Sequence, residues 1–227
     1  MINIKKYNNI YTKKFGYFNL YVIKGKYGDV LIDTGFICIK KPLKKWLDNF
    51  NIKLIILTHA HVDHIWNVAY LKKLYNCEIA IGKLDVKNIN NREISSTPSN
   101  NRHKYWTKLM HFGMKKFIPK AFDIDYELED KQIIKKYGLK LKIVSLPGHT
   151  VGSIGIVYKD YLFCGDALVN RKIRKVEIAY QNQNNDSAID SVLKIIELNP
   201  KLIFIGHDKE ITNTKLEKSF SNLIKEV

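Results

Sequence analysis

Four predicted strands in this chain each end beside residues that can bind a metal ion. The most apolar of them, at 53–57, is followed at once by the string Thr-His-Ala-His-Val-Asp-His at 58–64. Three later strands are each followed by a glycine and one more potential ligand: 139–146 by His149, 161–164 by Asp166 and 202–205 by His207. Loops that leave buried strands hold their side chains on a rigid scaffold. We therefore expect a sheet-based fold that gathers these polar side chains at one edge.

The string at 58–64 would be costly in an ordinary protein core. It brings three imidazoles and one carboxylate within six residues, and buried polar groups cost free energy unless something charged satisfies them. A metal ion satisfies them, and the whole chain then offers seven candidate ligands: His59, His61, Asp63, His64, His149, Asp166 and His207. A catalytic zinc site uses three protein ligands plus water, so seven candidates fit two ions that share a carboxylate.

The rest of the chain mixes strands and helices. Further strands are expected at 17–24, 29–33, 78–81 and 153–158. Helices are expected at 40–50, 65–75, 103–117, 187–198 and 214–226. This mixture indicates two sheets covered by outer helices, and the length of 227 residues suits a single domain over 1–227.

Charge and composition narrow the range of partners. The net charge is +16, but nearly all of the basic residues are lysines and only four are arginines. Arginine is the better bidentate clamp for phosphate, so its scarcity argues against a nucleic-acid partner. The lysines are interpreted as a solvated surface, and the alternative is a preference for an anionic small-molecule substrate. The sequence leaves the oligomeric state open.

Nothing in the sequence indicates a membrane or an oxidising compartment. No stretch approaches the roughly 18 to 20 apolar residues that cross a bilayer, and residues 1–14 lack the apolar core of a signal peptide. The three cysteines, Cys38, Cys77 and Cys164, are scattered and form no CxxC pair. We expect a protein of the reducing cytoplasm with no membrane contact.

The motifs together resemble those of the metallo-β-lactamase-fold hydrolase superfamily. The resemblance runs from Leu31-Ile-Asp-Thr-Gly35 through His207. Within the superfamily the chain is similar to the branch of hydroxyacylglutathione hydrolase (glyoxalase II) and the acyl-homoserine lactonases. The fold that this implies is of the α/β class, a four-layer αββα sandwich with the metals at one edge.

The resemblance also implies a role for each candidate ligand. The first ion would take the residues matching His59, His61 and His149. The second ion would take those matching Asp63, His64 and His207. The residue matching Asp166 would bridge the two ions, and the residue matching Asp33 would hold the ligand loop in place.

Several positions depart from the family pattern. Asp166 argues against β-lactamase activity, because true β-lactamases of this fold lack the bridging aspartate. The lactonases place a tyrosine three residues after that aspartate, where this chain has Val169. Family members often have Gly-Asn where this chain has Trp66-Asn67. About 20 residues follow His207, so we expect the helical extension that contacts glutathione in the hydroxyacylglutathione hydrolases to be truncated. The family is therefore better indicated than the substrate.

The resemblance implies a glyoxalase II-like, dinuclear metal-dependent hydrolase of a small ester, thioester or lactone. In such an enzyme a metal-bridging hydroxide is the nucleophile, and Asp63 is the catalytic residue that passes a proton to the leaving group. The cofactors are two divalent ions, with zinc favoured and iron or manganese also suited to these ligands. Two alternatives stay open: a phosphodiesterase or RNA-processing nuclease, and an iron-dependent oxidoreductase of the same fold.

Residues 92–120 are the part of the chain that the shared fold explains least. The helix expected at 103–117 carries four side chains on one stripe: Trp106, Met110, Met114 and Phe117. In one interpretation this is a lid insertion whose stripe packs over the site, with lysines that favour an acidic substrate. In the other, the stripe docks the helix on the core. The remaining histidines, His103 and His111, are expected to be structural or surface residues.

Overall fold

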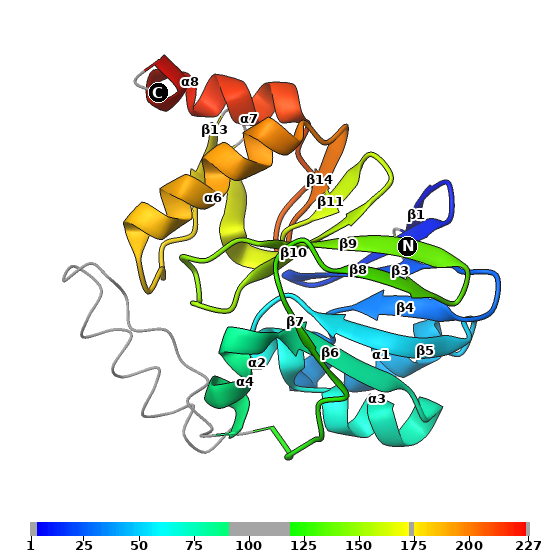
Figure 1. Ribbon diagram of the computed structural model, residues 1–227. Coiled ribbons are helices and arrows are strands. Elements are labelled where there is room, and N and C mark those ends of the chain that lie inside the picture. The colour runs from blue at the N-terminus through cyan, green and yellow to red at the C-terminus, as the bar shows by residue number, and fades with distance from the viewer. Residues whose placement is uncertain (1–3, 91–118, 173–174, 226–227) are drawn as a thin grey trace.

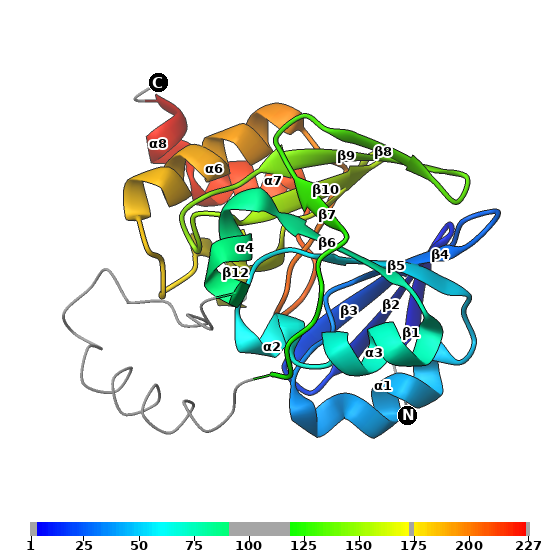
Figure 2. The same cartoon turned by 60° about the horizontal axis from the view of Figure 1, so that its bottom comes forward.

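The computed structural model describes residues 4–90, 119–172 and 175–225 (Figure 1). Two β-sheets lie face to face, and helices cover the outer face of each (Figures 1 and 2). This is the four-layer αββα sandwich of the α/β class that the resemblance implied. Within these ranges, no helix has both the length and the apolar composition to cross a membrane.

The first sheet has seven strands, which follow one another across it in chain order. They are β1 (Ile4–Tyr7), β2 (Ile10–Phe15), β3 (Phe18–Ile23), β4 (Asp29–Ile32), β5 (Ile52–Leu57), β6 (Glu78–Gly82) and β7 (Tyr126–Leu128). β1 to β4 pair antiparallel, and β4 to β7 pair parallel. Because parallel strands are buried on both faces, the continuous apolar run of β5 was enough to predict that strand.

The second sheet has five strands in the order β14-β11-β10-β9-β8. They are β8 (Ile133–Lys136), β9 (Leu139–Ser145), β10 (Ile154–Tyr158), β11 (Tyr161–Phe163) and β14 (Leu202–Phe204). β14 lies parallel to β11 at the edge, and the other pairs are antiparallel. Two further strands, β12 (Leu168–Lys172) and β13 (Lys175–Ile178), form a separate antiparallel pair.

Three apolar cores separate the four layers. α1 (Lys40–Leu47) and α3 (Val68–Tyr75) bury Leu43, Trp46 and Leu71 against the outer face of the first sheet. α6 (Asn185–Leu198) and α7 (Asn213–Ser219) do the same for the second sheet with Val192, Ile195 and Leu216. Between the sheets lies a third core, which contains Ile32, Ile56, Ile143, Ile156 and Phe163. These cores fix the two sheets relative to each other, and with them the loops at their edges.

The helix expected at 65–75 is divided in two. α2 (Val62–Ile65) begins inside the histidine string, and α3 begins only after Trp66 and Asn67. The Asn67 amide donates to the carbonyl oxygens of Thr34 (2.8 Å) and Phe36 (3.1 Å), and these long-range bonds interrupt the helix. The helix expected at 214–226 is likewise divided at Phe220, into α7 and α8 (Ser221–Lys225).

Other elements were not predicted. They are β1, β2, β7, β8, β12, β13, α4 (Lys83–Asn90) and two short 3₁₀ turns at Ile37–Ile39 and Gly165–Ala167. The lid expected at about 92–120 lies outside the described residues, apart from Pro119 and Lys120. The stripe of Trp106, Met110, Met114 and Phe117 and the two histidines His103 and His111 lie outside them too.

Candidate metal centre

Four loops meet at one edge of the two sheets, after β5, β9, β11 and β14. Backbone hydrogen bonds hold them together. Ile154 N donates to Thr58 O over 2.9 Å, and Gly206 N donates to Gly165 O over 2.8 Å. All seven candidate ligands lie on these loops or on the short helix α2, and the structure brings all of them together.

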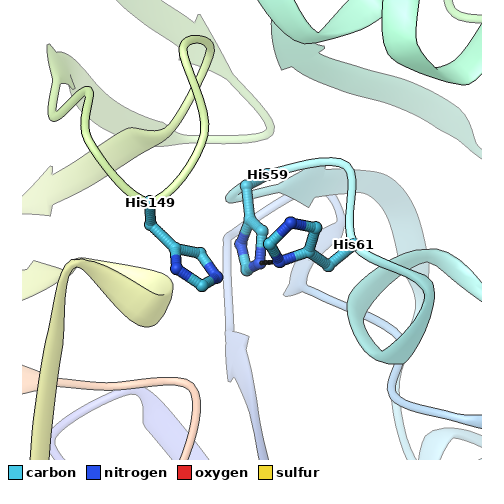
Figure 3. A group of neighbouring side chains, drawn as sticks. All are labelled: His59, His61 and His149. Atoms are coloured by element: carbon cyan, nitrogen blue, oxygen red, sulfur yellow. Dashed lines mark hydrogen bonds between the residues drawn. The ribbon is translucent and has the colours of Figure 1, made fainter. Parts of the chain in front are cut away.

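His59, His61 and His149 form a first group, called here the first triad. Nε2 of His59 lies 3.0 Å from Nδ1 of His61. The ring centroid of His149 lies 4.8 Å from that of His59 and 4.4 Å from that of His61. Figure 3 shows the three imidazoles converging on a common point from two separate loops.

Asp63, His64 and His207 form the second triad. Oδ2 of Asp63 lies 3.3 Å from Nε2 of His207 and 3.9 Å from Nε2 of His64. The side chain of His64 is buried, whereas that of Asp63 is 31% exposed. Asp63 is therefore the carboxylate of this cluster that faces solvent most openly.

Asp166 lies between the triads. Its Oδ1 is 3.5 Å from Nε2 of His64, and its Oδ2 is 3.7 Å from Nε2 of His149 and 3.1 Å from Nε2 of His207. The chain packs closely around it, since a Cβ on Gly206 would collide with Asp166 Oδ1. Only glycine fits at that position, which explains why a glycine precedes His207.

The spacing of the donor atoms is that of ligands around shared ions. Two ligands of one tetrahedral zinc, each about 2.0 to 2.1 Å from it, lie roughly 3.3 Å apart. Six donor pairs of this cluster are separated by 3.0 to 3.9 Å, and within each group the donor atoms lie within 4.8 Å of one another. Among the described residues, His64 Nε2, His149 Nε2 and Asp166 Oδ1 are buried without a hydrogen-bond partner. Such atoms cost free energy, and cations would satisfy them, so the residues fit two metal ions.

Two imidazoles of the first triad, those of His59 and His149, are held in their neutral form. Burial, together with the neighbouring imidazoles, lowers the pKa of His59 well below its ordinary value. Burial and the nearby His61 lower the pKa of His149 to about 3. Neutral imidazole is the form that binds a metal, so these two side chains are ready to bind without losing a proton.

The imidazoles of the second triad are held in their charged form. Burial opposes this at His64, but the charges of Asp33, Asp166 and Asp63 outweigh it and raise its pKa well above the ordinary value. At His207 burial is again outweighed, chiefly by Asp166, and the pKa rises to about 10. The pKa of Asp63 falls to about 2 despite burial, because of His64 and His207. Without a cation, protons supply the positive charge here.

Asp33 joins the end of β4 to the histidine string. Its carboxylate accepts hydrogen bonds from Thr58 N and Thr58 Oγ1, each at 2.8 Å, and faces Nδ1 of His64 at 2.8 Å. All of these groups are buried. The contact to Nδ1 of His64 leaves Nε2 of that ring for the second triad. This agrees with the expectation that Asp33 holds the ligand loop in place.

Asn19 holds the His207 loop and was not predicted. Its backbone N donates to Gly206 O, and its side-chain amide donates to the carbonyls of Ile205 (3.1 Å) and Asp208 (2.6 Å). His207 Nδ1 in turn lies 2.9 Å from the carbonyl oxygen of Tyr17. No local pattern identifies Asn19, because its partners lie 186 and 189 residues away in the chain.

A row of aromatic rings leads away from His207. The ring of Phe18 lies 5.8 Å from the His207 ring and 6.5 Å from the ring of Phe36. Phe36 in turn lies 4.9 Å from Trp66. Tyr17, which precedes Phe18 in the chain, is 81% exposed. The second triad therefore borders on an apolar surface.

A family model described as the metallo-beta-lactamase superfamily matches residues 15–207. A probable metallo-hydrolase of Methanocaldococcus jannaschii is 34% identical over 153 residues, covering 66% of this chain and 66% of that protein. A hydroxyacylglutathione hydrolase of Blochmanniella pennsylvanica is 29% identical over 187 residues, covering 81% of this chain but only 59% of that enzyme. The chain thus spans somewhat less than two thirds of the length of these two relatives.

The fold is also found among solved structures. A metallo-beta-lactamase family protein of Thermus thermophilus superposes with a TM-score of 0.70 at 18% identity. The superposition covers 97% of this chain and 79% of that one. At this identity the likeness concerns the fold alone.

Proposed function

The chain belongs to the metallo-β-lactamase superfamily, and from that premise we propose that it hydrolyses small carboxylic esters, thioesters or lactones with the help of two metal ions. One observation carries the proposal: seven donor side chains form two triads on either side of one carboxylate. The family model shows membership of the superfamily, and both the metal-dependent hydrolysis and the nature of the ester belong to the proposal.

In the proposed centre the first triad would hold one ion and the second triad the other. Asp166, with one carboxylate oxygen towards His64 and the other towards His149 and His207, lies where it could contribute a ligand to both. Zinc suits this set of imidazoles and carboxylates, and iron or manganese suits it as well. When bound, such ions polarise a carbonyl group and lower the pKa of coordinated water.

Asp63 is proposed to move the proton in this reaction. Its carboxylate borders the second triad, and its exposed fraction of 31% allows contact with a substrate, while His59 and His149 are buried. In the metal-free protein His64 and His207 lower the pKa of Asp63 and keep its carboxylate ionised. A proton taken from the attacking water can then pass to the leaving group, which departs as an alcohol or thiol.

The aromatic row beside His207 supports an ester over a phosphodiester. Phe18, Phe36 and Trp66 offer apolar contact to an acyl or alkyl group, and none of them can neutralise a phosphate. The scarcity of arginine points the same way. A small-molecule substrate, acidic where the lysine-rich surface guides it, is therefore part of the proposal.

The test combines metal content with a substrate panel. Protein stripped of metal should take up two equivalents of zinc or manganese, measured by elemental analysis after gel filtration. The loaded protein should then hydrolyse acyl thioesters, lactones and aryl esters faster than bis-aryl phosphodiesters, and the His59→Ala variant should be the inactive control. Uptake of a single equivalent, or a clear preference for phosphodiesters, would overturn the proposal.

A further inference from the structure

Asp85 on α4 is a fully buried carboxylate that no sequence motif singled out. Its Oδ2 accepts hydrogen bonds from Ala60 N and from Thr150 Oγ1, each at 2.8 Å. Its Oδ1 accepts a hydrogen bond from Gly152 N at 3.0 Å. One carboxylate therefore joins the loop after β5 to the loop after β9.

These contacts lie beside the ligands of the first triad. Ala60 stands between His59 and His61, and Thr150 directly follows His149. The loops that carry the three imidazoles belong to different sheets, so their separation is not fixed by strand pairing within either sheet. No hydrogen bond of Asp85 within the described ranges reaches a residue of the second triad.

We propose that Asp85 is a positioning residue that sets the geometry of the first triad by fixing the distance between its two loops. The inference rests on the proposed metal centre and adds a residue to it. Asp33 contacts Thr58 and His64 in the corresponding way, so each triad has its own buried aspartate. Among the described residues, Asp85 has hydrogen bonds to no loop other than those of the first triad. Asp33 contacts His64 of the second triad directly and His59 of the first through Thr58.

The fit around Asp85 is too close to be incidental. A Cβ on Gly152 would collide with Asp85 N and lie 2.6 Å from Asp85 Oδ1, so the second loop approaches the carboxylate where only glycine fits. Asn88 Nδ2, one turn further along α4, completes the set of donors at 3.1 Å. Burial raises the pKa of Asp85 while these hydrogen bonds oppose the rise. A buried carboxylate without a cationic partner is costly, and here each of its oxygens is used to hold a ligand loop.

A residue that only stabilises the fold would change the melting temperature without changing metal affinity, and Asp29 provides the control for that case. Asp29 is also buried, and its carboxylate also accepts backbone hydrogen bonds, from Gly25 N (3.1 Å) and Asn51 N (2.8 Å). It lies at the opposite end of β4 from Asp33, and neither of these two bonds involves a ligand loop. Asp29→Asn therefore measures what the loss of a buried aspartate does to stability alone.

The experiment measures cobalt binding one triad at a time. In a His207→Ala background only the first triad is complete, and in a His61→Ala background only the second is. Asp85→Asn should weaken Co²⁺ binding roughly 10- to 100-fold in the first background and change the visible absorption spectrum of the bound cobalt. In the second background the affinity should change less than about twofold, within the usual scatter of independent sites. Asp29→Asn should lower the melting temperature and leave both affinities and both spectra unchanged.

Each outcome decides between the alternatives. An equal loss of Co²⁺ affinity in both backgrounds, or no loss in the His207→Ala background, would overturn the positioning role of Asp85. This holds even if the unmodified protein binds two ions. Failure of the unmodified protein to bind two ions would instead overturn the proposed function. If Asp85→Asn does not fold, Thr150→Val removes one of the same hydrogen bonds, and a smaller loss confined to the first background is then expected. An unchanged first-background affinity in Thr150→Val would count against the inference.

Discussion

The two triads differ in the charge that they carry before any cation binds. Burial keeps His59 and His149 of the first triad neutral, whereas neighbouring carboxylates keep His64 and His207 of the second triad protonated. A cation can bind His59 and His149 without displacing protons from them, but it must displace protons from His64 and His207. The difference teaches that two neighbouring sites can be prepared for metal in opposite ways. In one, burial keeps the imidazoles uncharged, and in the other, protons hold the positive charge that a cation would replace.

The largest expected effect separates catalysis from metal binding. Asp63→Asn removes the proton carrier of the second triad and keeps a weak ligand, so kcat should fall by roughly 10²- to 10⁴-fold. The first triad contains no atom of Asp63, so at least one equivalent of metal should stay bound. Steady-state kinetics and elemental analysis of the same preparation provide the measurement. A kcat equal to that of the unmodified protein would remove Asp63 from the mechanism.

The next effect concerns the support of the second triad. Asp33→Ala removes the carboxylate that faces Nδ1 of His64, and the ion of the second triad should bind about 10- to 100-fold more weakly. The ion of the first triad should bind more weakly by a smaller factor, because Asp33 reaches that loop only through Thr58. Asp29→Ala, on the same strand, is the matched control. Stepwise zinc titration distinguishes the two ions. An equal loss of affinity for both ions would show that Asp33 does not support the second triad in particular.

The opposite charge states predict a stability maximum for the metal-free protein. The pKa of His149 is about 3 in the folded protein, against an ordinary value of 6.5. Between these pH values the unfolded chain binds a proton at His149 and the folded chain does not. The free energy of unfolding therefore falls as the pH drops from 6.5 towards 3. The pKa of His207 is about 10, so its contribution is complete below 6.5 and is lost as the pH rises through 10.

The melting temperature of the metal-free protein should therefore be highest near pH 6.5 and fall on both sides. Metal loading should flatten the profile, because bound cations replace protons in the second triad and keep the first triad deprotonated. His207→Gln should reduce the alkaline fall, and His149→Gln should reduce the acidic fall. Matching pH profiles for these two variants would show that the triads do not differ in the manner described.

The smallest effect concerns the outer support of the second triad. Asn19→Ala removes two side-chain hydrogen bonds to the loop that carries His207, at a cost of about 1 to 3 kcal/mol in stability. Zinc affinity should fall a few-fold in the second triad only, since hydrogen bonds removed at one loop leave the other loops in place. Asn9→Ala is the control. Asn9 lies at the far end of the β2–β3 hairpin from its turn, and it also joins the two sheets, through a hydrogen bond to Tyr158. A comparable change of metal affinity in Asn9→Ala would show that Asn19 acts through general stability alone.

Three of the four strands that precede candidate ligands could be predicted from the sequence because their burial is local and nearly continuous. The runs at β5, β11 and β14 are almost wholly apolar, and each has both faces covered, so a short window of sequence is enough to recognise it. The polar residues that follow them could then be placed at one edge. That the seven side chains come together was expected, and their identity as ligands stays a proposal.

The supports of the site could not be predicted in this way. Asp85 appears in the sequence as one acidic residue in a short polar helix, and its partners Ala60, Thr150 and Gly152 are 25 to 67 residues away. Asn67, which divides the expected helix, also bonds to carbonyls more than 30 residues away. Such residues act through tertiary contacts, which leave no periodic pattern in the chain.

The position of β14 at the edge of the second sheet has a consequence for the order in which the molecule is made. The chain is synthesised from its N-terminus, so four of the seven candidate ligands have been added once His64 is in place, and His149 later completes the first triad. β8 to β11 can pair with one another once β11 has followed and before β14 is made, because β14 adds only to the outer side of β11. The second triad waits for His207. A nascent chain that folds as it emerges thus passes through a stage with one finished triad and one open triad, at which a single ion can be captured before the second has a place to bind.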